Sequence, residues 1–104
     1  MAKVISINEE NFTEEVLNHD GTVLVDFYSE RCPPCQQMAP IIDKLATDSP
    51  EMKVVKVEAI DNADLAAEYS VNSIPTFILF ENGGVTKAKS GIIPPAQLKR
   101  WVES

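Results

Sequence analysis

The two cysteines of this chain, Cys32 and Cys35, are separated by two prolines, Pro33 and Pro34, in the stretch SERCPPCQQMAP. Two thiols at this spacing are typical of a metal site or of a pair that cycles between dithiol and disulfide. A zinc site needs four ligands, and besides the two thiols the chain offers a single histidine, His19, in a different segment. The first residues, MAKVISINEENF, lack the apolar region and cleavage site of a signal peptide. We therefore expect a cytoplasmic protein, in which stable structural disulfides are rare, and a redox-active pair rather than a zinc site or an inert pair.

The residues after Cys32 predict a helix that runs from Pro33 to about Asp48. Its apolar side chains recur at three- and four-residue intervals, at Met38, Ile41, Ile42 and Leu45. Pro40 lies inside this segment and is expected to kink the helix. Cys32 is therefore predicted to stand at the junction between a strand and the start of a helix.

This position gives the two thiols different chemistry. A thiol at a helix N-terminus feels the positive end of the macrodipole, which favours the reactive thiolate. We therefore interpret Cys32 as the exposed attacking thiol and Cys35, one turn later, as the resolving thiol. Pro33 and Pro34 fit the first helical turn, where a missing N–H has no intrahelical partner. The N–H of Cys35 remains available to donate to the sulfur of Cys32.

A carboxyl group, Asp26, lies within the apolar run TVLVDFYS, which is typical of a central strand buried on both faces. Burial disfavours the charged form, so the pKa of Asp26 is expected to rise toward neutrality. Such a group can accept the proton of Cys35, through water, and act as a general acid or base. The alternative is a hydrogen-bonded structural aspartate that faces a loop.

The remaining apolar patterns predict strands that alternate with helices and then a hairpin. A short strand at 4–7 and a helix near 12–17 precede the central strand, and a strand at 53–60 and a short helix near 65–69 follow the long helix. Residues 76–91 read as a hairpin around Asn82-Gly83, and a last helix follows Pro94-Pro95. The predicted order is β-α-β-α-β-α-β-β-α, an α/β fold with a central mixed sheet and helices on both faces. We expect a single domain over residues 1–104.

The overall charge limits the classes of partner. Nine basic and sixteen acidic side chains give a net charge of −7. Nucleic acids and anionic membranes attract clustered lysine and arginine, so neither is expected as a partner. No apolar run approaches the ~18 residues of a membrane span. A cytoplasmic monomer is expected.

Taken together, several segments resemble the thioredoxin family over nearly the whole chain. The matching stretches are VLVDFYSE, CPPC, MAPIIDKLA, KVEAIDNADLAAEYSVNSIPTFILFENG and Ser90-Gly91. The resemblance implies a thioredoxin-like fold and a protein-disulfide reductase that forms a mixed disulfide with its disulfide-containing protein substrates. It implies no bound cofactor or metal besides the Cys32–Cys35 pair, and recharging by a thioredoxin reductase, either NADPH-dependent or ferredoxin-dependent. It also implies that Cys32 is the nucleophile, Cys35 the resolving thiol and Asp26 the buried acid.

The resemblance extends to a substrate groove and to a lysine. Pro75, in SIPT, matches the family's cis-proline, which faces the disulfide and helps to present the substrate backbone. The groove would also include the neighbours of that proline, the residues beside and between the cysteines, and two residues near the end of the hairpin: Ile74, Thr76, Arg31, Pro33, Pro34, Gly91 and Ile92. The family has a lysine near the buried acid. Counting back from SIPT places it at Lys56, whereas counting forward from Asp26 would place Val57 there, and a solvated strand lysine is the alternative reading.

Three departures from the family pattern lie beside the thiols. Pro33 replaces the usual glycine, and Tyr28 and Arg31 replace the usual tryptophans. Arg31 would bring a positive charge close to the nucleophile, with an effect on its pKa and on partner preference. The alternative functions are therefore a related oxidant or isomerase with a raised potential, and a non-catalytic binding module with the same fold.

Overall fold

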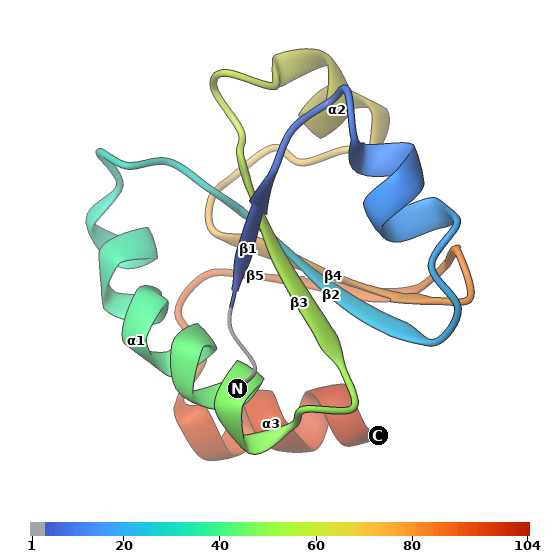
Figure 1. Ribbon diagram of the computed structural model, residues 1–104. Helices are drawn as coiled ribbons and strands as arrows, with labels where there is room; N and C mark the ends of the chain where they lie inside the picture. Colours follow the sequence, from blue (N-terminus) through green and yellow to red (C-terminus); the bar gives the residue numbers. More distant parts are fainter. Residues whose placement is uncertain (1–3) are drawn as a thin grey trace.

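The computed structural model describes residues 4–104, and its centre is a five-stranded mixed sheet (Figure 1). The strand order is β1-β3-β2-β4-β5. The strands are β1 (Ile5–Ile7), β2 (Thr22–Tyr28), β3 (Lys53–Glu58), β4 (Thr76–Glu81) and β5 (Gly84–Ser90). β1, β3 and β2 are parallel, and β4 and β5 continue the sheet in antiparallel pairing.

Strand β2 lies in the middle of this sheet, as its nearly continuous apolar sequence predicts. It pairs with β3 on one side and with β4 on the other, and its residues from Val23 to Phe27 are all buried. Strands covered on both faces lack an alternation of polar and apolar residues, because both sides contact the core. The prediction of a central buried strand is confirmed, and Asp26 is the polar residue within it.

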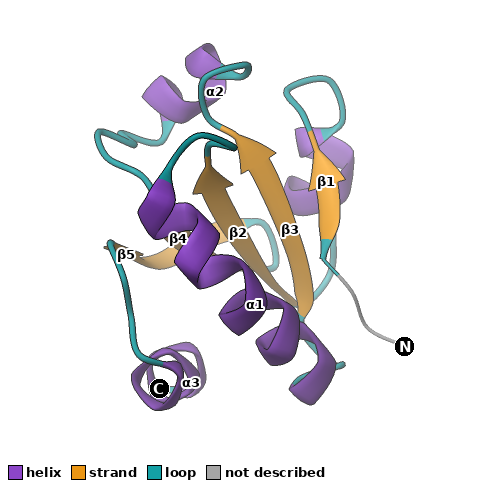
Figure 2. Ribbon diagram, turned by 90° about the vertical axis from the view of Figure 1, so that its left-hand side faces the viewer, coloured by secondary structure: helices purple, strands orange, loops and turns teal. Residues whose placement is uncertain are grey.

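Helices cover both faces of the sheet, as the alternation of elements predicts. The helical segments are η1 (Thr13–Leu17), a short turn of the wider π type, and the α-helices α1 (Pro33–Asp48), α2 (Ala63–Glu68) and α3 (Pro95–Glu103). Met38 and Ile42 of α1 and Leu98 of α3 pack with Leu24 on one face, while η1 and α2 contribute to a second cluster around Val25 on the other. Figure 2 shows α1 lying across the front of β2 and β3, and α2 at the top, beyond the ends of these strands. No helix of residues 4–104 has the length and apolar character to cross a membrane.

The hairpin between β4 and β5 turns at Asn82-Gly83, the position that the sequence predicts. Both residues have positive φ, 50° and 85°, as a two-residue turn of this kind requires. The amide of Asn82 donates to Gly21 O at 2.9 Å, and its side-chain oxygen accepts from the Gly21 N–H at 2.7 Å. These bonds join the hairpin to the loop that leads into β2.

Helix α1 begins at the residue that the sequence predicts and positions the cysteine pair. It follows the carboxyl end of β2, and Cys32 is its N-cap with extended backbone angles. Pro33 and Pro34 occupy its first turn, and the helix continues through Pro40 to Asp48. Because Pro40 lacks an N–H, one hydrogen bond of the helix is missing there; the kink expected at this residue stays a prediction.

Candidate active site

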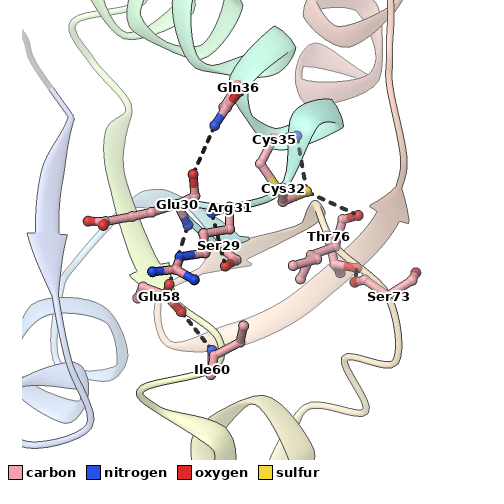
Figure 3. Close-up of a disulfide and its surroundings, with 11 residues drawn as sticks. Ser29, Glu30, Arg31, Cys32, Cys35, Gln36, Glu58, Ile60, Ser73 and Thr76 are labelled. Carbon is pink, nitrogen blue, oxygen red and sulfur yellow. Dashed lines mark hydrogen bonds between the residues drawn. A yellow bond between two sulfur atoms is a disulfide. The ribbon is translucent and has the colours of Figure 1, made fainter.

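Cys32 and Cys35 form a disulfide at the N-terminus of α1, with their Cα atoms 5.1 Å apart (Figure 3). The backbone N–H of Cys35 donates to Cys32 Sγ at 3.2 Å, as the position of the two prolines predicts. Cys32 is less exposed than the sequence analysis expects: 8% of its surface is accessible, against 6% for Cys35. The two sulfurs therefore differ mainly in their surroundings, because Cys32 Sγ sits at the helix cap and beside a neighbouring loop.

The first turn of α1 favours a negative charge at the Cys32 sulfur. No acidic side chain lies in that turn, so nothing there opposes the positive end of the helix. The N–H of Cys35 is one of the free donors at the helix start and points at this sulfur. A thiolate at Cys32 would retain this donor when the disulfide is reduced.

Asp26 is buried behind the disulfide, with 7% of its surface accessible. Among the side chains that the structure describes, Asp26 Oδ1 is a buried oxygen without a hydrogen-bond partner. Desolvation raises the pKa of Asp26 from 3.8 to about 7, although the charge of Lys56 acts to lower it. This is the direction that the apolar surroundings of Asp26 predict, and it leaves the carboxyl able to exchange a proton near neutral pH.

A cavity of about 220 Å³ joins Asp26 to the second cysteine. Asp26, Cys35 and Lys56 all line it, together with residues of β2 and α1. A cavity of this size has room for water, and the polar groups of Asp26 and Lys56 in its lining can hold a water that relays a proton between groups that do not touch. A larger hollow of about 440 Å³ lies between α1 and α3, but neither cysteine nor Asp26 lines it, so it is not the site of this chemistry.

The strand register places Lys56, and not Val57, opposite Asp26. Val57 lies opposite Phe27 and is buried in the core on the other face of the sheet. The ammonium of Lys56 lies over the ring of Tyr28, 5.3 Å from the ring centroid. Lys56 is thus near the acid, as counting back from SIPT predicts, and it has an aromatic contact that the sequence analysis did not predict.

The loop before β4 approaches the disulfide from the other side. The Ile74–Pro75 peptide is cis, and the carbonyl oxygen of Ile74 lies 3.8 Å from Cys32 Sγ. The N–H of Gly91 donates to Pro75 O at 2.9 Å, which brings the end of β5 beside this loop. Ile92, the next residue, has 55% of its surface exposed. Ile74, Pro75, Gly91 and Ile92 thus form one rim next to the sulfur of Cys32.

The other residues expected in the substrate groove, Thr76, Pro33, Pro34 and Arg31, differ in how much surface they expose beside the disulfide. Thr76 is buried, and its hydroxyl is bonded within the loop, to Ser73 O at 2.6 Å and to Ser90 Oγ at 2.7 Å. Its side chain therefore fixes the loop and does not offer contact surface. Pro33 is exposed and Pro34 partly exposed beside the disulfide. The side chain of Arg31 is exposed, and Figure 3 shows its guanidinium on the side of Glu58, turned away from the two sulfurs.

Glu58 is a further polar residue of this region, and its role was not among the predictions from the sequence. Its carboxylate accepts from the N–H of Ile60 at 2.7 Å and from the N–H of Glu30 at 3.3 Å, and so joins the loops after β3 and β2 (Figure 3). Desolvation acts to raise the pKa of Glu58, but the hydrogen bonds to its carboxylate outweigh this and hold the pKa below the ordinary value. The available signal was strand alternation, because Glu58 follows Lys56 by two residues and faces the same side of the sheet.

Within residues 4–104 no three histidine, cysteine or acidic side chains gather in a way that could hold a metal ion. A thiol pair at a helix start, an adjacent cis-proline loop and a buried acid can together carry out dithiol–disulfide exchange.

Comparison with known proteins gives the same result. The sequence profile of the family described as Thioredoxin matches residues 3–104. A thioredoxin of Haemophilus influenzae is 37% identical over 103 residues, which are 98% of this chain and 96% of the relative. A thioredoxin of Pseudomonas aeruginosa is 35% identical over 102 residues, 97% of this chain and 94% of the relative. The solved structure of a mutant thioredoxin from Halobacterium salinarum superposes with a TM-score of 0.90 at 29% identity, covering 97% of this chain and 88% of that one. The chain therefore belongs to the thioredoxin family, and its cysteine pair makes it a thiol–disulfide oxidoreductase.

Proposed function

We propose that this chain is a general protein-disulfide reductase of the cytoplasm, in which Cys32 attacks, Cys35 resolves and Asp26 moves the proton. The observation that carries the proposal is the arrangement around one disulfide. Cys32 Sγ sits at a helix start beside the Ile74 carbonyl, and Cys35 shares a cavity with a carboxyl whose pKa is about 7.

The reaction begins from the reduced form of the pair. The Cys32 thiolate attacks one sulfur of a substrate disulfide, the substrate S–S bond breaks, and the departing substrate thiolate takes up a proton. Cys35 then loses its proton to ionised Asp26 through water in the shared cavity, and its thiolate attacks Cys32 Sγ. The mixed disulfide breaks, the second substrate sulfur leaves as a thiolate that takes up a proton, and the Cys32–Cys35 disulfide remains. Two electrons have passed from the protein to the substrate.

The rim beside Cys32 supports an extended protein segment as the substrate. Ile74 and Ile92 offer apolar surface, and the Ile74 carbonyl is an acceptor for a substrate N–H next to the reacting sulfur. Pro33, Pro34 and the backbone at Arg31 border the other side of the disulfide. The family as a whole is recharged by thioredoxin reductase, and we propose that this chain, as a monomer, takes its electrons from such a reductase, NADPH-dependent or ferredoxin-dependent.

Trapping with single-cysteine variants tests the assignment of the two sulfurs. Cys35→Ser should accumulate mixed disulfides with protein substrates, because nothing then attacks Cys32 Sγ in the adduct. Cys32→Ser is the matched control and should accumulate none. Trapping by Cys32→Ser alone would reverse the assignment, and failure of the intact protein to reduce insulin disulfides with dithiothreitol would identify a binding module without catalysis.

The reduction potential separates a reductase from an oxidant or isomerase. A helix start without acidic residues stabilises the Cys32 thiolate, which favours the dithiol and raises the potential. The guanidinium of Arg31 lies away from the sulfurs and should add little to this effect. Equilibration with a glutathione buffer gives the value directly. A reduction potential of the Cys32–Cys35 pair clearly above that of the glutathione couple would favour the oxidant or isomerase.

A further inference from the structure

Four polar side chains occupy one face of the sheet where β2 and β3 approach their carboxyl ends. Asp26 lies opposite Lys56, and Tyr28 lies opposite Glu58. Successive side chains of a strand alternate between the two faces, so residues two apart share a face, and paired residues of neighbouring strands do too. The four side chains therefore form the corners of a small square that faces α1.

The ammonium of Lys56 lies over one corner of this square. Its nitrogen is 5.3 Å from the centroid of the Tyr28 ring. Within residues 4–104 the ion pairs are Lys44–Asp48 and Lys53–Glu15, so no described carboxylate lies within ion-pair distance of Lys56. The close contact of the Lys56 ammonium is therefore with the Tyr28 ring. An ammonium over the face of an aromatic ring is attracted by the ring quadrupole.

Other carboxylates line the same cavity as Lys56, and none of those described forms an ion pair with it. The titratable groups near the cavity of the oxidised protein are Asp26 and Tyr28 from β2, Glu30 from the loop after β2, Asp43 from α1, and Lys56 and Glu58 from β3. Glu58 is already occupied, because it accepts from the N–H groups of Glu30, Ile60 and Asp61. Glu30 and Asp43 line the cavity and are the alternative partners to which a released ammonium could turn.

We propose that Tyr28 is a positioning residue, whose ring holds the Lys56 ammonium at the cavity of Asp26 and thereby sets how readily that carboxyl ionises. The inference rests on the proposed role of Asp26 as the proton acceptor for Cys35. Tyr28 stands where the family usually has tryptophan. In this proposal it acts on the site through Lys56 and not through contact with the sulfurs.

The chemistry of the ring fits this role. Burial, together with the carboxylates of Glu30 and Glu58, raises the pKa of the Tyr28 phenol above its ordinary value of 10.0, so the ring is neutral at physiological pH. The attraction therefore comes from the face of the ring and not from a phenolate. Since the charge of Lys56 lowers the pKa of Asp26 against the larger effect of desolvation, loss of the ring should weaken this influence and raise that pKa.

The test compares variants of Tyr28 in the oxidised protein, by following the Asp26 carboxyl carbon with NMR as a function of pH. Tyr28→Leu should lower the ionisation constant of Asp26 by about two- to fivefold, the range that a modest cation–π contact implies. Tyr28→Phe is the matched control, because it keeps the ring and removes only the hydroxyl, and its titration should stay close to that of the parent. In a Lys56→Met background, Tyr28→Leu should produce no further shift.

Two results would overturn the proposal. An equal shift in Tyr28→Leu with and without Lys56 would show that the ring acts by excluding water, and an equal shift in Tyr28→Phe would assign the effect to the hydroxyl. If Tyr28→Leu does not fold, the proton chemical shifts of Lys56 in the parent protein provide the test. Ring currents of Tyr28 should move the side-chain protons of Lys56 upfield, and chemical shifts typical of an exposed lysine would contradict the contact. None of these readouts depends on disulfide reduction, so a failure of the proposed function would appear separately, in the insulin assay.

Discussion

Replacement of Asp26 by asparagine should stabilise the fold by an amount that depends on pH. Each pKa unit corresponds to about 1.36 kcal/mol, so a pKa of about 7 in place of 3.8 corresponds to about 4 kcal/mol. The sign follows from proton counting. Between these two pKa values the unfolded chain has released the proton while the folded protein still holds it, so ionisation opposes folding and stability falls as pH rises.

Asp26→Asn removes this dependence. Well below pH 3.8 the carboxyl is neutral in both states, and the variant and the parent should have similar free energies of unfolding. The variant should then become progressively more stable than the parent, until the difference levels off above pH 7 near about 4 kcal/mol, an upper value because water can enter the cavity.

Guanidinium unfolding of the oxidised protein at several pH values between 3.5 and about 8.5 measures the difference. The disulfide must stay intact, so that the two variants are compared in one redox state. Asp20→Asn, at an exposed loop carboxyl, is the control for the loss of one negative charge and should not reproduce the growing difference. A constant difference between Asp26→Asn and the parent across this range would show that Asp26 ionises freely in the folded protein, and would refute the argument from burial.

Two further predictions concern the fold around the site. Gly83→Ala should lower the free energy of unfolding by roughly 1–3 kcal/mol, because Gly83 has a φ of 85° and a Cβ there would collide with a backbone carbonyl of η1. A Cβ on Gly84 would make only ordinary contacts, so Gly84→Ala should change the free energy of unfolding by less than about 0.5 kcal/mol. Lys53→Met should cost about 1–3 kcal/mol, since it removes a 2.8 Å ion pair with the half-buried Glu15. Lys44→Met, which breaks an exposed pair, should cost less than about 0.5 kcal/mol. Denaturant unfolding of the oxidised protein checks both predictions. An equal loss of unfolding free energy in Gly83→Ala and Gly84→Ala, or in Lys53→Met and Lys44→Met, would contradict the reasoning.

Much of the fold was predictable from local patterns. The strand at Thr22–Tyr28 and the helix at Pro33–Asp48 begin and end within a residue of the expected positions, because both are long and strongly patterned. The turn at Asn82-Gly83 was equally clear, since few residue pairs adopt two successive positive φ values. The two-faced α/β arrangement followed from the order of these elements.

The candidate site was predictable to a lesser degree. The spacing of Cys32 and Cys35 before a helix was enough to indicate redox chemistry, and the apolar neighbours of Asp26 were enough to indicate a raised pKa. The position of Lys56 was ambiguous by one residue. A one-residue slip in register moves a side chain to the other face of a sheet, and only the pairing with β2 resolved it.

The sequence by itself determined the elements, their order, the thiol pair and the acid behind it, because each depends on residues that are close together along the chain. Only the tertiary structure decided the limited exposure of Cys32, the turn of Arg31 away from the sulfurs, and the contact of Lys56 with Tyr28. The physical reason is that all three depend on neighbours that folding brings together from distant segments. The loop at Ile74 lies against Cys32, and long side chains such as Arg31 and Lys56 have many rotamers of similar energy among which such neighbours decide. No local pattern of the sequence records those neighbours.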